Sequence, residues 1–213
     1  DRTGYPGDAW IGEVRVACLG ACADEDFLTE PAPGWEATET SRCGWTADNG
    51  GSFSIDNSIQ TEDTCSTTIG WAGGPFTLEF DFFISRLDWA AQWVFGLWAA
   101  EMNIDSSLRI ALHVGRADGG SMLGVYGCDQ SHDDLTHPPP LDTWLTARLE
   151  YTGTSVSVGV WERATNTEVF SHTLDGTTCS GLTRLGSTML GYDRPAYGPQ
   201  HLQVYVDNIR FSQ

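Results

Sequence analysis

Polar and aromatic side chains that could hold a small hydrophilic ligand recur among the apolar runs of this sequence. Seven of them are candidates for a ligand site: Glu79, Asp81, Gln92, Trp98, Arg109, His113 and Tyr126. Flat aromatic rings can stack on sugar rings, whereas carboxylates, amides and guanidinium groups bind hydroxyls, and a saccharide pocket needs both kinds. The pattern therefore predicts a carbohydrate site, although charged groups on one sheet face are also the ordinary sign of a solvated surface.

Strands must position these residues, because apolar and polar side chains alternate around them with a period of two. In residues 76–84, five apolar side chains take one side while Glu79 and Asp81 take the other, and residues 108–114, 145–151 and 156–160 repeat the pattern. Residues 87–102 suit a strand better than a helix because of their Trp and Val content. Many short strands separated by turn residues predict an all-β fold, an antiparallel β-sandwich (jelly roll) of two curved sheets.

The last apolar run contains a change of phase. Leu202, Val204 and Val206 occupy even positions, whereas Ile209 and Phe211 occupy odd ones. An extra residue in one strand of a pair produces such a slip, so we expect a β-bulge at Asp207-Asn208.

The strand pattern continues without an internal repeat or a low-complexity linker. Single sandwiches of about 200–250 residues are common, so we expect one domain over residues 1–213. Residues 133–140 are expected to form a surface loop. Residues 1–24 supply an extra strand segment, in which residues 10–16 could pair with the closing strand or with a neighbouring molecule.

The charge of the chain excludes several classes of function. The 213 residues carry 11 Lys+Arg against 29 Asp+Glu, a net charge of −18, and all 11 cations are arginine. Phosphate-binding loops, Schiff-base enzymes and pyridoxal-phosphate enzymes need a lysine amine. So negative a surface also disfavours nucleic acid and anionic lipid. The sequence has no run of about 18 apolar residues that could span a membrane.

Six cysteines are dispersed through the acidic, glycine-rich chain, which favours disulfides and an oxidising, extracellular compartment. Six cysteines allow 15 connectivities. The spacings favour Cys18–Cys22, Cys43–Cys65 and Cys128–Cys179. A zinc site would need two close pairs, and only Cys18 and Cys22 are close.

Four stretches resemble, in the right order, the concanavalin A-like lectin/glucanase (laminin-G-like) superfamily of β-sandwiches. They are residues 204–211 (VYVDNIRF) as the closing strand, 75–82 (PFTLEFDF) as the strand after the first loop, 142–160 as a Trp-led central hairpin, and Asp26-Phe27 with Trp35 as the opening strand. The resemblance covers residues 25–213 and implies a jelly roll that holds glycans on its concave face.

The resemblance also implies a structural calcium ion. In the superfamily the closing-strand Asp commonly ligates calcium together with an acidic residue near the opening strand, and the matching residues are Asp207 and Asp26. Independently, calcium prefers oxygen ligands, and a bulge turns a carbonyl and a carboxylate the same way. The alternative is that Asp207 only hydrogen-bonds a turn.

Two enzymatic readings are weaker. Superfamily glucanases carry Glu-x-Asp-x-x-Glu, but the third acid is replaced here by Ile84, which argues against that hydrolase mechanism. Superfamily polysaccharide lyases use a His/Tyr pair with Arg and Gln, and His113, Tyr126, Arg109 and Gln92 are the right types. The flanking Gln-[Ile/Val]-His motif is replaced by Ala111-Leu-His113.

The sequence therefore predicts an extracellular, disulfide-stapled, lectin-like module that binds an oligo- or polysaccharide and holds a structural calcium ion. A polysaccharide lyase or other glycan-degrading enzyme of the same fold is one alternative. A structural or adhesive surface protein that assembles through its N-terminal strand is the other.

Overall fold

The computed structural model describes residues 24–25, 35–37, 43–46, 52–57, 63–88, 91–102, 108–117, 120–128, 132–135, 138–191 and 202–213. These segments form β-strands and their connections, and within them no helix is found. The described segments therefore include no helix long and apolar enough to cross a membrane. The strand segment expected within residues 1–24 lies almost wholly outside the described residues.

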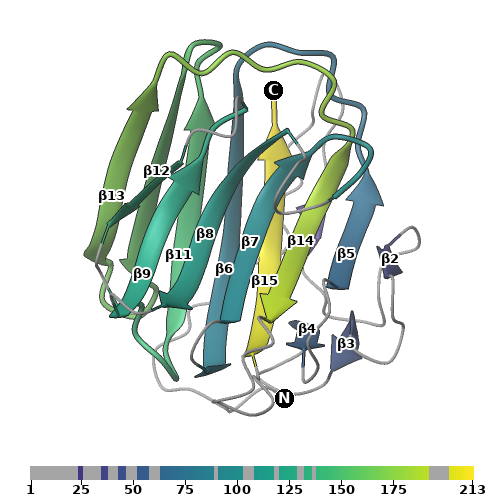
Figure 1. Ribbon diagram of the computed structural model, residues 1–213. Helices are drawn as coiled ribbons and strands as arrows, with labels where there is room; N and C mark the ends of the chain where they lie inside the picture. The colour runs from purple at the N-terminus through teal and green to yellow at the C-terminus, as the bar shows by residue number, and fades with distance from the viewer. Residues whose placement is uncertain are drawn as a thin grey trace.

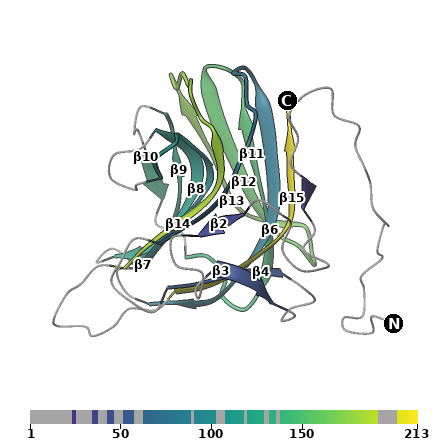
Figure 2. The ribbon, with the colours of Figure 1, turned by 90° about the vertical axis from the view of Figure 1, so that its right-hand side faces the viewer.

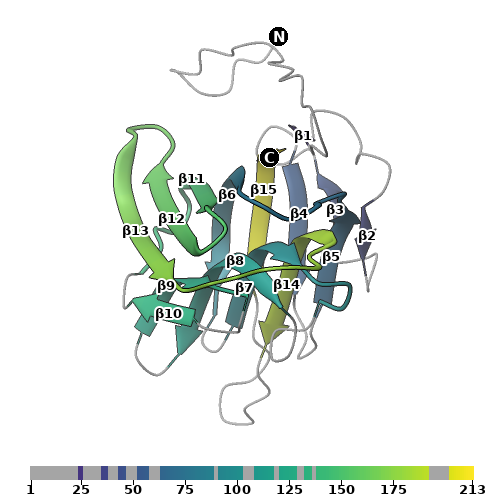
Figure 3. The same cartoon turned by 90° about the horizontal axis from the view of Figure 1, so that it is seen from above.

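The strands form two antiparallel sheets that pack face to face (Figures 1 and 3). The first sheet has the order β13-β12-β11-β6-β15-β4-β3, with β1 also paired to β15. Its strands are β1 (Asp24–Glu25), β3 (Cys43–Thr46), β4 (Ser52–Asn57), β6 (Phe76–Leu87), β11 (Trp144–Tyr151), β12 (Ser155–Glu162), β13 (Thr167–Asp175) and β15 (Leu202–Ser212).

The second sheet has the order β10-β9-β8-β7-β14-β5-β2 and lies in front in Figure 1. Its strands are β2 (Glu36–Ala37), β5 (Asp63–Thr68), β7 (Ala91–Trp98), β8 (Arg109–Ala117), β9 (Gly120–Tyr126), β10 (His132–Leu135) and β14 (Arg184–Gly191). Seen from the side, these strands bend so that the outer face of the sheet is concave (Figure 2). The all-β, antiparallel sandwich predicted from the sequence is confirmed.

The core lies between the sheets and follows the predicted alternation. Phe80 and Phe82 of β6 are fully buried and face Trp93 and Phe95 of β7, with ring centroids 4.4 Å apart for Phe80–Phe95 and 5.3 Å for Phe82–Trp93. Each buried large side chain stabilises the fold by about 1.5–3 kcal/mol relative to its exposed state. The period-two pattern therefore identified the inner faces correctly, apart from Leu108, which precedes β8 and is exposed.

The predicted bulge is also confirmed. Asp207 pairs with Asp81 of β6, but the next ladder pair is Arg210 with Glu79, so the register shifts between them. Asn208 adopts a positive φ of 51°. Asn tolerates this left-handed conformation better than most residues, because its short polar side chain forms local hydrogen bonds.

A disulfide links the two cysteines predicted to pair at the far end of the chain. Cys128, which follows β9, bonds Cys179, which precedes β14. The Tyr151 hydroxyl accepts a hydrogen bond from the Cys179 amide at 2.9 Å and donates one to the Gly153 carbonyl at 2.8 Å. Cys65 is also disulfide-bonded. Cys18 and Cys22 lie outside the described residues, so their pairing and that of Cys43 stay predictions.

One local prediction needs correction. Residues 133–140 were expected to form a loop, but His132–Leu135 forms the edge strand β10, which pairs with β9 from Tyr126 to Leu123. The backbone groups at the edge of β9 make this pairing possible although the segment is polar. Residues 138–140 are free of strand structure, as expected of three prolines.

Candidate functional site

The seven candidate residues lie on two different faces of the sandwich. Glu79 and Asp81 belong to β6 and point away from the core on the first sheet, whereas the other five belong to β7, β8 and β9 of the second sheet. The expectation that all seven share one face is therefore wrong. Period two separates inner from outer side chains, but a sandwich has two outer faces, and the chain crosses from one sheet to the other between β6 and β7.

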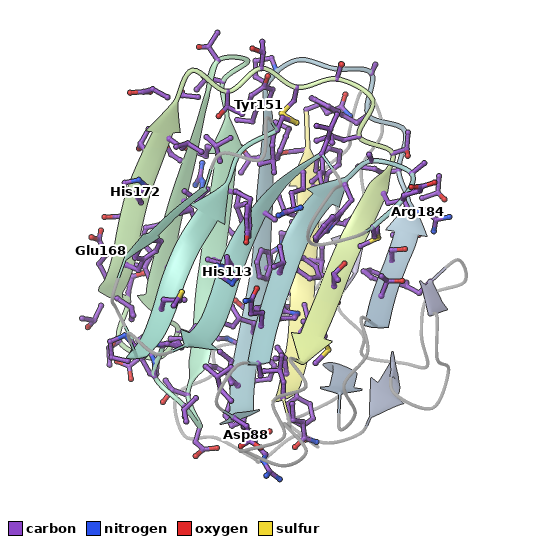
Figure 4. The ribbon with its side chains drawn as sticks, in the orientation of Figure 1. Asp88, His113, Tyr151, Glu168, His172 and Arg184 are labelled. Carbon is purple, nitrogen blue, oxygen red and sulfur yellow. A yellow bond between two sulfur atoms is a disulfide. The ribbon has the colours of Figure 1, made fainter. Side chains whose placement is uncertain are left out.

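Strand register brings the five residues of the second sheet together. Trp98 of β7 pairs with Arg109 of β8, and Ala111 of β8 pairs with Tyr126 of β9. Two positions further along β8, His113 faces the same side, and it occupies the middle of the sheet in Figure 4. Residues two apart on a strand share a face, so the candidates occupy adjacent positions of one surface.

Four of these side chains form a continuous stack, which we call the arginine stack (Trp98, Arg109, Tyr126 and His113). The guanidinium carbon of Arg109 lies 3.9 Å from the ring centroid of Tyr126 and 5.3 Å from that of Trp98. The rings of Tyr126 and His113 lie 5.2 Å apart. A cation within about 6 Å of an aromatic face is attracted by the ring quadrupole, most strongly where water is excluded.

Two glycines lie beside the stack, where the backbones of neighbouring strands approach each other closely. A Cβ at Gly96 would lie 2.1 Å from the Ile110 carbonyl oxygen, and one at Gly186 would lie 2.2 Å from the Cys65 carbonyl oxygen. The Trp98 indole N–H donates to the Gly186 carbonyl at 3.0 Å. The indole is therefore held by a hydrogen bond to the backbone of β14.

A third glycine connects the stack to Gln92. Gly115 is the cross-strand partner of Gln92, and a Cβ at position 115 would lie 3.0 Å from Nε2 of His113 and 3.5 Å from Cγ of Gln92. Both side chains therefore lie over Gly115. All four residues predicted for a lyase, namely Gln92, Arg109, His113 and Tyr126, are neighbours in the structure.

Burial divides this surface into two layers. Trp98, Arg109 and His113 are 0–3% exposed, and Tyr126 is 7% exposed, whereas Gln92 and Arg184 are half-buried. Trp98 also uses its only polar atom within the protein. Trp98, Arg109 and His113 therefore form the floor, Tyr126 is slightly more exposed, and Gln92 and Arg184 form the layer nearest to solvent.

Arg184 and Ser66 belong to this surface but were not among the candidates. Arg184 opens β14, pairs with Trp98, and donates from Nη1 to Oγ of Ser66 at 3.1 Å; Figure 4 labels it near the upper end of β14. The alternation in residues 184–190 was available in the sequence, but the position of β14 beside β7 was not. Among the outward strand residues of this face with described side chains, none is acidic.

The two remaining candidates make structural contacts on the first sheet. Glu79 accepts from Arg210 Nη1 at 3.1 Å. Asp81 accepts from Thr146 Oγ1 at 2.6 Å and from Asn208 Nδ2 at 2.7 Å, and Arg163 Nη1 lies 3.4 Å away. Both carboxylates are thus engaged with donors of the protein, which does not suit a pair of glycosidase acids.

The closing-strand Asp207 can be tested as a calcium ligand. It is 5% exposed, lies opposite Asp81, and accepts from the Asn208 amide at 2.9 Å. Its oxygen chemistry suits calcium, but the oxygens of Asp81 already accept from Thr146 and Asn208. Within the described part of the chain, no three acidic, His or Cys side chains gather as a metal site. Asp207 therefore fits as one calcium ligand, whereas Asp81 does not, because its oxygens are already engaged. Asp26, the other predicted ligand, lies outside the described residues.

Comparison with known proteins identifies the fold of the chain, but it finds no related sequence. No protein-family model matches the chain, and no curated protein sequence matches it. One similar solved structure is the Lotus tetragonolobus seed lectin, with 10% sequence identity and a TM-score of 0.67 over 90% of this chain and 97% of the lectin. Another is the Emp47p carbohydrate recognition domain, with 13% identity and a TM-score of 0.62 over 91% of this chain and 94% of that domain. The alginate lyase from Klebsiella pneumoniae is also similar, with 11% identity and a TM-score of 0.53 over 79% of this chain and 84% of the lyase. The chain therefore has the concanavalin A-like β-sandwich fold, and the resemblance drawn from the sequence is confirmed for the fold.

Proposed function

We propose that this protein binds an acidic polysaccharide on the concave outer face of its second sheet. The observation that carries the proposal is the convergence of Gln92, Arg109, His113 and Tyr126, which come from three strands, on one face around the arginine stack. Arg184 extends this surface by one more strand. Lectin and glycan-lyase structures share the fold, which supports a carbohydrate as the ligand class.

The chemistry of the outer layer suits a sugar chain. Gln92 offers an amide, Tyr126 a ring edge and a hydroxyl, and Arg184 a planar guanidinium group. Gln92 pairs with Leu190 of β14, six residues from Arg184, so these two ends of the face are separated by about 20 Å of strand. An extended chain of several sugar units can span such a distance, whereas a single small ligand cannot.

The charge distribution favours a polyanion over a neutral glycan. The whole chain carries a net charge of −18, yet this face holds Arg109 in its buried floor and Arg184 in the layer nearest to solvent. Local positive charge can attract an anionic ligand to a protein of the same overall sign. Guanidinium groups bind carboxylates through two parallel hydrogen bonds, as the uronate units of a polysaccharide would allow.

Polysaccharide lyase activity is the second candidate, because His113 and Tyr126 are in ring contact beside Gln92 and Arg109. In a β-elimination one group takes the proton at C5 of a uronate, the C4–O bond breaks, and the leaving oxygen receives a proton. A His/Tyr pair can perform both proton transfers. An amide and a guanidinium group can stabilise the carboxylate while negative charge develops.

Two further proposals concern the compartment in which the protein works and a bound calcium ion. The Cys128–Cys179 disulfide supports an oxidising, extracellular compartment, where such bonds persist. We also propose a structural calcium ion held by Asp207 together with Asp26. The third interpretation of the sequence, an adhesive protein that self-assembles through residues 10–16, concerns residues outside the described part and stays a prediction.

A glycan array combined with an absorbance assay tests the proposal. The array compares alginate and polygalacturonate with neutral glucan, xylan and mannan, and the assay follows the unsaturated uronates that a lyase would release. We expect binding to the polyuronates. Release of unsaturated product that disappears in His113→Ala would establish the lyase candidate. Absence of binding to every polyuronate would contradict the proposed function.

A further inference from the structure

A groove lies on the side of the sandwich opposite to the concave face, on the outer face of the first sheet. It has a volume of about 280 Å³ and crosses β11, β12 and β13. The side chains used below are those of Arg148, Glu150, Ser157, Trp161, Ser171 and Thr173. Pockets for drug-sized molecules occupy about 300–1,000 Å³, so this groove has room for a small ligand.

The floor of the groove depends on one glycine. A Cβ at Gly159 would lie 2.1–2.8 Å from the six-membered ring of Trp161, so the indole occupies the space that a side chain at position 159 would fill. Gly159 is buried as a result, whereas Trp161 keeps part of its surface exposed. The bulge between Val160 and Trp161 breaks the ladder at the same place.

Polar groups of two kinds flank the indole. Cross-strand pairing places Arg148 beside Gly159 and Glu150 beside Ser157, and Arg148 Nη2 lies 2.5 Å from Oε1 of Glu150. Each of these two side chains is 47% exposed. An exposed ion pair contributes little to stability, so both groups can exchange this contact for ligand hydroxyls at small cost.

Hydroxyl groups form the other wall. Ser157 Oγ lies 2.9 Å from Thr173 Oγ1 across the β12–β13 ladder. Ser171, the partner of Gly159, donates to Oε1 of Glu168 at 2.7 Å. A hydroxyl can donate and accept at the same time, so this wall can bind sugar hydroxyls of either polarity.

We infer that this groove is a second saccharide site, which binds a single neutral pyranose against the indole of Trp161. The apolar ring, the charged pair and the hydroxyl wall are the three elements that position a sugar ring. The charges of Arg148 and Glu150 cancel locally, which favours a neutral sugar over a uronate. The inference does not rest on the proposed function, because the two sites lie on different sheets and share no residue.

Titration of the isotopically labelled protein with the methyl glycosides of glucose, galactose, mannose and xylose tests this inference. We expect at least one glycoside to cause saturable NMR shifts at the amides of Ser157, Gly159 and Ser171. Trp161→Ala should weaken this binding at least tenfold. Trp144→Ala, which removes a half-buried Trp elsewhere on the same face, should leave it unchanged.

Thr173→Val is a second variant in case Trp161→Ala does not fold, since it removes one exposed hydroxyl and nearly preserves shape. It should weaken glycoside binding several-fold. The inference is overturned if no glycoside shifts the groove amides, or if binding persists unchanged in the folded variants. Shifts caused by a proline-rich peptide, with none from the glycosides, would identify a protein ligand instead and would equally overturn it.

Discussion

The guanidinium carbon of Arg109 lies 3.9 Å from the centroid of the Tyr126 ring, although the two residues belong to different strands. The pairing of Ala111 with Tyr126 sets this relationship, because Arg109 precedes Ala111 by two positions on the same face. Arg109 is also in reach of Trp98, so one cation joins residues of β7, β8 and β9. The arginine stack is therefore one unit, and a change in any member should be felt by the others.

Replacement of Arg109 by lysine should show how much the stacking of its guanidinium group on the aromatic rings contributes to stability. Arg109→Lys keeps the charge but removes the flat guanidinium group that stacks on aromatic rings. We expect the free energy of unfolding to fall by about 0.5–2 kcal/mol. Urea unfolding measures the change, and Arg210→Lys, at an exposed ion pair, should change stability by less than about 0.5 kcal/mol. Equal effects of the two substitutions would contradict the stack.

Two glycine substitutions should separate site geometry from sheet stability. The nearest atom to a Cβ at Gly115 belongs to the His113 side chain, whereas at Gly96 it is a backbone oxygen at 2.1 Å. Gly96→Ala should therefore cost about 1–3 kcal/mol through overpacking. Gly115→Ala should displace the imidazole with a smaller loss of stability and weaken polyuronate binding. Thermal melts of both variants measure the loss of stability, and binding titrations measure the affinity for polyuronate. A larger loss of stability in Gly115→Ala than in Gly96→Ala would contradict the prediction.

The disulfide between Cys128 and Cys179 should stabilise the fold substantially. The two cysteines are 51 residues apart in sequence. Closing a loop of that length removes about 4 kcal/mol of conformational entropy from the unfolded chain. The double variant Cys128→Ser/Cys179→Ser should lose about 2–4 kcal/mol in urea unfolding. A loss below about 1 kcal/mol would show that the bond does not constrain the unfolded state as argued.

Calcium at Asp207 predicts a change in melting temperature. EDTA should lower the melting temperature of the protein, since a ligand bound only to the folded state at 100 times its Kd stabilises it by about 2.7 kcal/mol. Asp207→Ala should lose this response, and Asp175→Ala, at an exposed acid of β13, should keep it. A melting temperature unaffected by EDTA would refute the calcium proposal.

Particular residues show what could be read from the sequence. The alternation from Phe76 to Ile84 identified buried side chains because one sheet face must be apolar, and the phase slip at Asp207-Asn208 identified the bulge for the same reason. These features depend on neighbours along the chain. A local pattern therefore sufficed for strands, inner faces and the bulge.

The assignment of strands to sheets depends on contacts that a local pattern does not contain. Glu79 and Gln92 are 13 positions apart, yet β6 and β7 belong to different sheets, so the two side chains lie on opposite outer faces. Conversely, Arg184 lies beside Trp98 although 86 positions separate them. Gln92, Arg109, His113 and Tyr126 lie on one face because β7, β8 and β9 follow each other both in the chain and in the sheet.

Isothermal titration with an alginate oligosaccharide tests the central claim most directly, with Arg184→Gln and Arg210→Gln as a matched pair of charge-removing variants. Arg184 lies on the concave outer face of the second sheet and Arg210 on the first sheet. Loss of a charged hydrogen bond costs about 1.5–3 kcal/mol. We therefore expect Arg184→Gln to weaken binding by about 10-fold or more and Arg210→Gln to leave it unchanged. Equal binding by the wild-type protein and Arg184→Gln, or the larger loss in Arg210→Gln, would contradict the claim.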